Sequence, residues 1–332
     1  MMIDHGGNLD VALNRFGGPL EDWIDLSTGI NRRPYPVDEL QPRHWNALPS
    51  RSDIASLHGA ARQAYATGAP ILATAGAQGA IQLLPQLMPR SGAKILAPTY
   101  DEFGAVLKAA DWQVERVADA AALAGADLAV VVNPNNPDGR RHAPQQLLAL
   151  LPRVGRLIVD ESFADALPDL SLAPEAGRPG LLILRSFGKF YGLAGLRLGF
   201  VLGCETDIAA LARLAGPWPI SGAAIAIGRR ALLDRDWARE TTARLACDAE
   251  RLDELAQRAG WMLAGGTPLF RLYDTGDAAA AQERLARAHI WSRIFAGQPS
   301  WLRLGLPGDE TEWRRLSTAL SPYHLFVRGL DC

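Results

Sequence analysis

The stretch from residue 128 to residue 186 contains three short apolar runs: Leu128-Ala-Val-Val-Val132, Arg156-Leu-Ile-Val-Asp160 and Leu181-Leu-Ile-Leu-Arg-Ser186. Each run is dominated by β-branched or aliphatic residues and has the length of a strand. Strands of this kind are buried on both faces, which is typical of a parallel sheet covered by helices on its two sides. The stretch therefore predicts an α/β fold.

Working outward, four further apolar runs flank these three, and helical stretches separate most of them. We therefore expect a mainly parallel, doubly wound sheet of seven strands, whose ligand sites lie at the carboxyl ends of the strands. The four runs are Ile71–Thr74, Lys94–Ala97, Trp112–Val117 and Leu198–Leu202, and the helical stretches are Ala80–Met88, Glu102–Ala110 and Pro144–Leu151.

The sequence after Cys204 changes character. Alanine-, arginine- and glutamate-rich helical sequence fills residues 206–259, and short strand-like pieces and a final helix follow, which indicates a smaller α+β domain. The first residues contain too few apolar positions to form a core alone. We expect an N-terminal segment (1–35) lying across the other parts, a large domain (36–216) and a small C-terminal domain (217–332), with the break near Pro217-Trp218-Pro219.

Composition excludes several classes of protein. The 332 residues include 34 Lys and Arg against 36 Asp and Glu, a net charge of −2 that argues against a nucleic-acid partner. No apolar run approaches the roughly 18 residues that a bilayer span needs, so no membrane partner is expected. The N-terminus does not resemble a signal peptide, and the three cysteines are scattered. We expect a cytoplasmic protein without a disulfide framework or a metal site.

The segment from Leu184 to Phe200 carries the strongest chemical signal. A strand ends at Ser186, a single lysine, Lys189, follows within apolar and aromatic sequence, and Arg197 comes eight residues later. A partly desolvated lysine can act as an amine nucleophile towards an aldehyde, while a hydroxyl and a guanidinium suit a phosphate. The alternative is a solvated surface lysine beside a glycine-rich turn.

Other predicted strand ends carry matching groups. The turn Thr74-Ala-Gly-Ala-Gln-Gly79 would present the N–H groups of Ala77 and Gln78 at a helix N-terminus, although many such turns bind nothing. Tyr100 offers a ring for stacking or is a core tyrosine. The turn Asn133-Pro-Asn-Asn-Pro-Asp-Gly139 offers amide donors or is purely structural. Asp160 ends an apolar strand, where a carboxylate needs a cationic partner. Together these groups meet the requirements of pyridoxal 5′-phosphate.

In these motifs the chain resembles the fold-type-I, class I and II pyridoxal-phosphate aminotransferases over nearly its whole length. The resemblance implies a homodimer in which Lys189 is the catalytic residue, joined covalently to the cofactor and moving the proton. It also implies that Asp160 pairs with the pyridine nitrogen, that Asn136 bonds the ring oxygen, and that Tyr100 stacks on the ring. The implied phosphate ligands are Ala77, Gln78, Ser186 and Arg197, and Arg303 is the implied clamp for the substrate carboxylate.

Two N-terminal motifs narrow the resemblance. His5-Gly-Gly-Asn8 and Asp25-Leu-Ser-Thr-Gly-Ile-Asn31 resemble a subfamily, the threonine-phosphate decarboxylases, which is similar to histidinol-phosphate aminotransferases. The subfamily implies decarboxylation of O-phospho-L-threonine, a small phosphorylated amino acid, to (R)-1-amino-2-propanol O-phosphate for cobalamin biosynthesis. Without the resemblance, His5 could equally be a mobile terminal residue, and Arg293 could equally be a charged residue on the surface. The implied substrate contacts are His5, Gly6, Gly29, Asn136, Arg293 and Arg303.

Two other functions remain open at this point. The first is an aminotransferase acting on histidinol phosphate or a related phosphorylated amine, and the second is a non-catalytic binding protein with the same fold. Three positions depart from the wider family pattern. Phe163 replaces a tyrosine that bonds the ring oxygen, Leu48-Pro49 replaces a tyrosine-proline pair that reaches the neighbouring subunit's cofactor, and Asp138 replaces a threonine.

Overall fold

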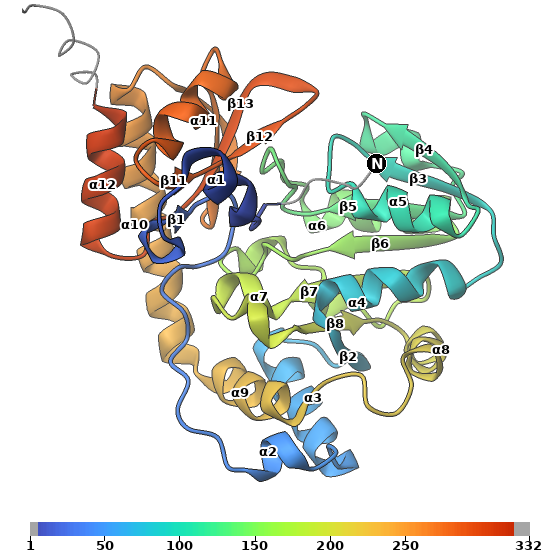
Figure 1. The fold of residues 1–332 in the computed structure, drawn as a ribbon. Helices are drawn as coiled ribbons and strands as arrows, with labels where there is room; N and C mark the ends of the chain where they lie inside the picture. Colours follow the sequence, from blue (N-terminus) through green and yellow to red (C-terminus); the bar gives the residue numbers. More distant parts are fainter. Residues whose placement is uncertain (1–5, 322–332) are drawn as a thin grey trace, which may run out of the picture. The chain divides into compact units, whose positions relative to one another are not determined.

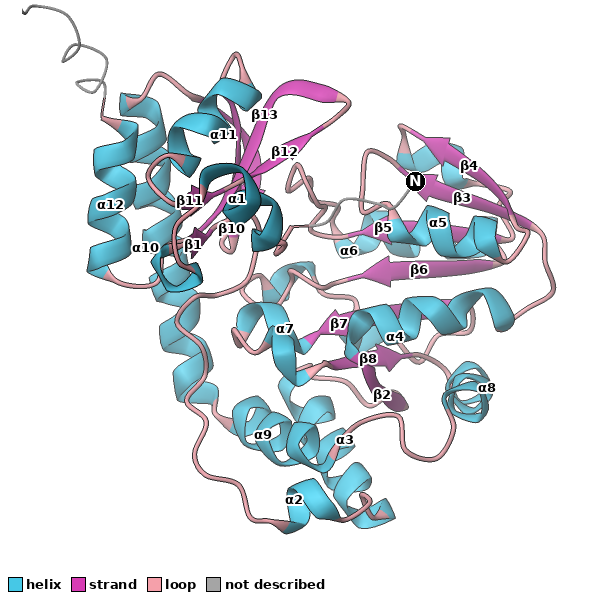
Figure 2. Ribbon diagram, viewed as in Figure 1, coloured by secondary structure: helices cyan, strands magenta, loops and turns pink. Residues whose placement is uncertain are grey.

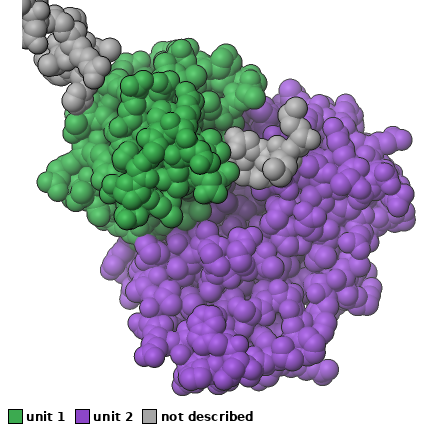
Figure 3. Space-filling model, in the orientation of Figure 1, with its two compact units in different colours: residues 1–33, 241–332 green, residues 34–240 purple. Residues whose placement is uncertain are grey.

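The computed structural model describes residues 6–321 of the chain. These residues fall into two compact units, shown in different colours in Figure 3. Residues 34–240 form one unit, and the described parts of 1–33 and 241–332 form the other. No helix within 6–321 is both long enough and apolar enough to cross a membrane.

The unit of residues 34–240 is built on a seven-stranded sheet, drawn in magenta in Figure 2, with the strand order β2-β8-β7-β6-β5-β3-β4. Only β8 runs antiparallel to its neighbours, which are β2 and β7. The predicted mainly parallel sheet of seven strands is therefore confirmed. The strands are β2 (Ile71–Ala75), β3 (Gly92–Leu96), β4 (Gln113–Val117), β5 (Leu128–Val132), β6 (Arg156–Asp160), β7 (Leu181–Ser186) and β8 (Leu198–Leu202).

Helices of this unit pack on the sheet through apolar side chains. Ile81, Phe103 and Leu211, from three different helices, join one cluster with the strand residues Val130 and Ile158, and all five are almost fully buried. Alternate residues of β5 face this cluster because successive side chains of a strand point to opposite faces. The helices are α2 (Arg43–Asn46), α3 (Arg51–Ala64), α4 (Gly76–Leu83), α5 (Glu102–Ala109), α6 (Pro144–Leu148), α7 (Phe187–Phe190), α8 (Glu205–Ala215) and α9 (Gly222–Leu233).

The other unit combines the N-terminal segment with the end of the chain. A four-stranded antiparallel sheet has the order β12-β13-β10-β9, and β1 pairs in parallel with β11. The strands are β1 (Ile24–Asp25), β9 (Met262–Thr267), β10 (Phe270–Asp274), β11 (Ile290–Trp291), β12 (Arg293–Phe295) and β13 (Gln298–Gly305). The helices are α1 (Leu9–Phe16), α11 (Ala278–Ala286) and α12 (Glu310–Leu320), and this unit also holds most of α10 (Arg235–Arg258).

The two units change over inside α10, between residues 240 and 241, whereas the sequence places a break near residue 217. Helix α9 accounts for the difference, because it packs along α3 and so brings residues 222–233 into the larger unit. Figure 1 shows α3 and α9 side by side. Residues 6–33 fold with residues 241–321 through the β1–β11 pair, so the N-terminal segment shares a core with the C-terminal part.

Candidate active site

Strand ends bring several of the predicted cofactor residues to one edge of the seven-stranded sheet. Asp160 is the last residue of β6, and Ser186 is the last residue of the neighbouring β7. Lys189 lies in α7, which begins directly after Ser186, and Arg197 directly precedes β8. Because β8 runs antiparallel to β7, its first residues lie at the same edge as the last residues of β7. The register thus places an amine, a carboxylate, a hydroxyl and a guanidinium together.

Lys189 is half-buried and lies over an aromatic ring. Its Nζ is 4.9 Å from the centroid of Phe163, which is itself buried. The face of an aromatic ring attracts an ammonium group, so Phe163 holds the lysine at the sheet edge. At this position the chain has a ring without a hydroxyl, directly beneath the proposed nucleophile.

Asp160 is a buried carboxylate. The residue is 3% exposed, and Oδ1 accepts a hydrogen bond of 2.9 Å from the Ser162 amide. Burial raises the pKa of Asp160 above its ordinary value, while Ser162, Lys189 and Arg185 act in the opposite direction. A cation beside this carboxylate would offset the cost of its buried charge. A protonated pyridine nitrogen is a cation of that kind, so Asp160 fits the predicted cofactor.

Helix α4 begins at this edge without a capping side chain. Its N-cap residue is Ala75, whose side chain makes no capping hydrogen bond. The Arg197 guanidinium lies against Gly76, because a Cβ added to Gly76 would be 2.9 Å from Nη2 of Arg197. A helix N-terminus without a cap, with a guanidinium beside it, suits a phosphate group. The arrangement fits the proposed role of the Ala77 and Gln78 amides.

Gly199 makes this arrangement possible. A Cβ at this position would lie 2.5 Å from the carbonyl carbon of Gly76 and would overlap the amide nitrogen of Ala77. A side chain here would therefore push β8 away from the start of α4.

We expect Gly199→Ala to destabilise the apoprotein by about 1–3 kcal/mol, because the added methyl group meets backbone atoms that cannot rotate away. We expect cofactor affinity to fall with it. Urea denaturation and a cofactor titration measure the two effects. Gly195→Ala is the matched control, because a Cβ there meets nothing within 4 Å. Equal stability of the two variants would contradict the prediction.

Tyr100 is linked to the start of α4 through side chains. Its hydroxyl donates a 3.3 Å hydrogen bond to Oε1 of Gln78, whose Nε2 donates a 2.8 Å bond to Glu102. Burial raises the pKa of Tyr100 to about 12, with smaller increases from Glu102 and Asp160 and a decrease from Arg197. The tyrosine therefore lies within the electrostatic field of both Asp160 and Arg197. Its stacking role stays a prediction.

The asparagine turn after β5 divides into structural and candidate functional residues. Oδ1 of Asn135 accepts a 2.6 Å bond from Thr99, and its Nδ2 donates a 2.7 Å bond to Asp138. Asn133 bonds the backbone of His142 through both side-chain atoms. Asn136 is the partly exposed member of the three. Asp138, which departs from the family pattern, thus stabilises the turn.

The predicted substrate residues that the structure describes, other than Asn136, belong to the second unit. Arg293 of β12 lies opposite Arg303 of β13 in the antiparallel register. Burial and Arg293 lower the pKa of Arg303 to about 10, and Asp25 acts against them. Nη2 of Arg303 donates a 2.7 Å bond to the Ser27 carbonyl. Gly29 is buried after β1, Gly6 is partly exposed, and His5 lies outside the described residues.

Sequence reasoning missed a buried ion-pair network beside Asp160. Arg185 donates 2.8 Å bonds to Glu161 and to Asp165, and its guanidinium carbon is 4.4 Å from the ring centroid of Tyr65. Burial alone lowers the pKa of Arg185, but Asp165 and Glu161 raise it above its ordinary value. An arginine inside an otherwise apolar strand was the signal in the sequence. The network anchors the carboxyl ends of β6 and β7.

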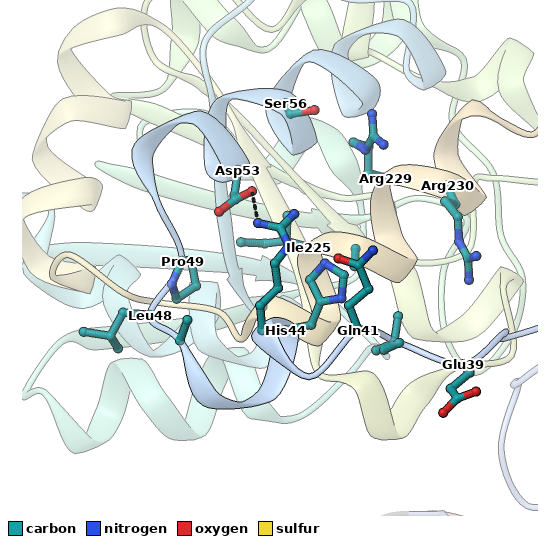
Figure 4. Close-up of a pocket in the computed structure, with 15 residues that line it drawn as sticks. Glu39, Gln41, His44, Leu48, Pro49, Asp53, Ser56, Ile225, Arg229 and Arg230 are labelled. Carbon is teal, nitrogen blue, oxygen red and sulfur yellow. Dashed lines mark ion pairs between the residues drawn. The ribbon is translucent and has the colours of Figure 1, made fainter.

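A surface cavity of about 440 Å³ lies elsewhere in the larger unit. Segments 39–56 and 222–230 line it, as Figure 4 shows, and they include Leu48 and Pro49. None of the predicted cofactor or substrate residues lines this cavity.

Comparison with known proteins identifies the family. The model of the family described as aminotransferase class I and II matches residues 43–320. A threonine-phosphate decarboxylase from a Sinorhizobium species is 46% identical over 97% of this chain and 99% of its own length. Another, from Pseudomonas aeruginosa, is 43% identical over 96% of this chain and 97% of its own.

Solved structures agree on the fold. The histidinol-phosphate aminotransferase from Sinorhizobium meliloti, solved in complex with pyridoxal-5′-phosphate, matches with a TM-score of 0.77 at 20% identity and covers 96% of this chain and 94% of its own. Since the family model matches well over half of the chain, the protein belongs to the aminotransferase class I and II family.

Proposed function

We propose that the chain binds pyridoxal 5′-phosphate in the unit of residues 34–240. The uncapped start of α4, Ser186 and Arg197 would hold the phosphate, Asp160 would face the pyridine nitrogen, and Lys189 would form the covalent link. The bound group would withdraw electrons from the substrate Cα. The supporting observation is the buried Asp160 carboxylate at the same sheet edge as Lys189 and Arg197.

We propose that the enzyme decarboxylates O-phospho-L-threonine to aminopropanol phosphate, a building block for cobalamin. The observation that carries this proposal is the similarity, over 97% of the chain and 99% of the relative, to the Sinorhizobium threonine-phosphate decarboxylase. The paired Arg293 and Arg303 support it, because a substrate with a carboxylate and a phosphate suits two guanidinium groups.

The chain's own residues would then have distinct roles. Arg303 would bind the substrate carboxylate, and Arg293, with His5 and Gly6, would bind the phosphate. We propose that anchoring the phosphate at His5 and Arg293 orients the substrate so that the bond from Cα to the carboxylate would be the one that breaks. Carbon dioxide leaves, its bonding electrons stay with Cα, and Lys189 Nζ delivers one proton to Cα.

An assay with O-phospho-L-threonine tests the reaction. We expect the purified holoenzyme to release carbon dioxide and aminopropanol phosphate in equal amounts without any keto-acid acceptor. Formation of a keto acid from the substrate, with a required acceptor, would contradict the proposal. Amino transfer from histidinol phosphate would favour the alternative aminotransferase. A protein that cannot be reconstituted with the cofactor would favour the non-catalytic alternative.

We also propose that the enzyme is a homodimer. Trp45 and Leu48 are 70% and 68% exposed, and burying such apolar surface against a second copy would be favourable. Light scattering should give twice the chain mass of 35.8 kDa. A mass of one chain at micromolar concentration would contradict this.

A further inference from the structure

The segment after β1 is fixed in place by two strands of its own unit. The Leu26 amide donates a 2.8 Å bond to the Trp291 carbonyl, and the Leu26 carbonyl accepts a 2.7 Å bond from the Gly305 amide. Gly305 also approaches this segment so closely that a Cβ there would overlap the carbonyl oxygen of Thr28. Residues 24–28 therefore form a rigid support beside the end of β13, two residues beyond Arg303.

Ser27 lies on this support and makes four polar contacts. Its amide and its hydroxyl both donate to Oδ1 of Asp25, at 2.8 and 2.6 Å. The same hydroxyl accepts a 2.8 Å bond from the Gly7 amide, and the Ser27 carbonyl accepts the 2.7 Å bond from Arg303. Ser27 is 1% exposed and its bond from Arg303 is buried, whereas its bonds to Asp25 and Gly7 are partly buried.

The glycine turn at residues 6 and 7 rests directly on Ser27. A Cβ added to Gly6 would lie 2.5 Å from the Ser27 carbonyl oxygen, and Gly7 has a φ of +89°, which favours glycine. Asn8, the next residue, caps helix α1 by accepting a bond from the Asp10 amide. The turn is thus held at one end by the helix cap and at the other by the Ser27 hydroxyl.

Asp25 contributes charge as well as hydrogen bonds. It raises the pKa of Arg303, against the lowering by burial and by Arg293. Asp25 also fixes the direction of the Ser27 hydroxyl, because an ionised carboxylate can only accept. The Ser27 oxygen is therefore left to accept from Gly7.

We propose that Asp25 and Ser27 are positioning residues that set the enzyme's preference for a phosphorylated substrate by fixing the turn at Gly6 and Gly7 beside Arg303. The inference rests on the proposed function. The Ser27 hydroxyl bonds the Gly7 amide, whereas the Ser27 carbonyl bonds Arg303. A mutation that removes only the hydroxyl therefore affects the turn and leaves the bond to Arg303 in place. Removing the hydroxyl should weaken binding of a phosphate group and leave binding of a carboxylate unchanged.

The test uses the holoenzyme and two simple ligands in isothermal titration calorimetry. O-phosphoethanolamine carries an amine and a phosphate without a carboxylate, and L-threonine carries an amine and a carboxylate without a phosphate. In Ser27→Ala we expect binding of O-phosphoethanolamine to weaken about tenfold, the effect of one lost hydrogen bond to a buried group. Binding of L-threonine should stay within about twofold, and the KM for O-phospho-L-threonine should rise more than kcat falls.

Two further variants complete the experiment. Ser292→Ala is the matched control, because Ser292 is an equally buried serine of the same unit whose hydroxyl has no partner within residues 6–321. Asp25→Ala removes the acceptor of both Ser27 donors and tests the second residue if Ser27→Ala does not fold. Binding of O-phosphoethanolamine should again weaken more than binding of L-threonine.

The outcomes separate the two proposals. Equal weakening of both ligands, or no weakening of O-phosphoethanolamine, would overturn the positioning role while the wild-type enzyme still decarboxylates O-phospho-L-threonine. If the wild-type holoenzyme neither binds O-phosphoethanolamine nor releases carbon dioxide, the proposed function is wrong, and the positioning role that rests on it is wrong as well.

Discussion

Replacing Lys189 with alanine is expected to lower decarboxylation of O-phospho-L-threonine by at least about 10³–10⁴-fold, because the variant loses both the covalent attachment and the group that moves the proton. Phe163 should keep its place, since it is buried among other side chains, so the variant should fold. The protein should also lose the visible absorbance of the covalently bound cofactor. Steady-state kinetics and an absorbance spectrum measure both effects.

The chain offers an unusually clear control for this prediction. It has only three lysines, Lys94, Lys108 and Lys189. Lys108 is an exposed residue of α5, so Lys108→Ala should change neither kinetics nor absorbance. Borohydride reduction of the holoenzyme followed by peptide mass spectrometry should place the reduced cofactor on Lys189 alone. Modification of Lys94 or Lys108 instead, or full activity of Lys189→Ala, would contradict the assignment.

The sheet could be predicted from the sequence because its central strands are buried on both faces. Runs such as Leu128–Val132 must then be apolar throughout, and each ends where the polar residues begin. Lys189 could be placed for the same reason, since it follows the end of such a run. The direction of each strand was harder to predict, because β8 is as apolar as the parallel strands of the sheet although it runs antiparallel to both of its neighbours, β2 and β7.

Features that depend on distant contacts could not be predicted in the same way. Residues 24–25 pair with residues 290–291, and nothing in two residues of sequence specifies such a partner. The support formed by Asp25 and Ser27 depends on that pairing. Helix α3, by contrast, was missed although its start is visible locally, because Ser50 and Asp53 form a capping box. Its sequence is more polar than that of α4 or α5, so a search for apolar runs passes over it.

Asp160→Asn is expected to lower activity by on the order of 10²–10³-fold, comparable with the loss of another fixed electrostatic contact to a reacting group. Asparagine has nearly the same shape, and its Oδ1 can still accept the bond from the Ser162 amide. The variant therefore removes the charge and little else. Kinetics at saturating cofactor measure the effect, and activity within tenfold of wild type would contradict the pairing with the ring nitrogen.

The same variant should lose activity but should not lose thermal stability in its apo form. Burial raises the pKa of Asp160 in the folded apoprotein, so the folded state binds this proton more tightly than the unfolded state does. The resulting contribution to stability is fully present below the unfolded pKa, near 3.8, and is lost as the pH rises through the raised folded value. At neutral pH the apo form of Asp160→Asn, which carries no buried charge, should therefore unfold at the same or a higher temperature than apo wild type.

Adding the cofactor should reverse this order. A cation beside Asp160 stabilises its ionised form, so wild type should gain more thermal stability from the cofactor than Asp160→Asn gains. Asp165→Asn is the informative comparison, because it weakens the Arg185 network at a carboxylate to which no cofactor contact is assigned. It should destabilise the apo and holo forms alike. If Asp160→Asn also lowers the stability of both forms equally, the carboxylate serves the fold and not the cofactor, and the charge-pairing role is wrong.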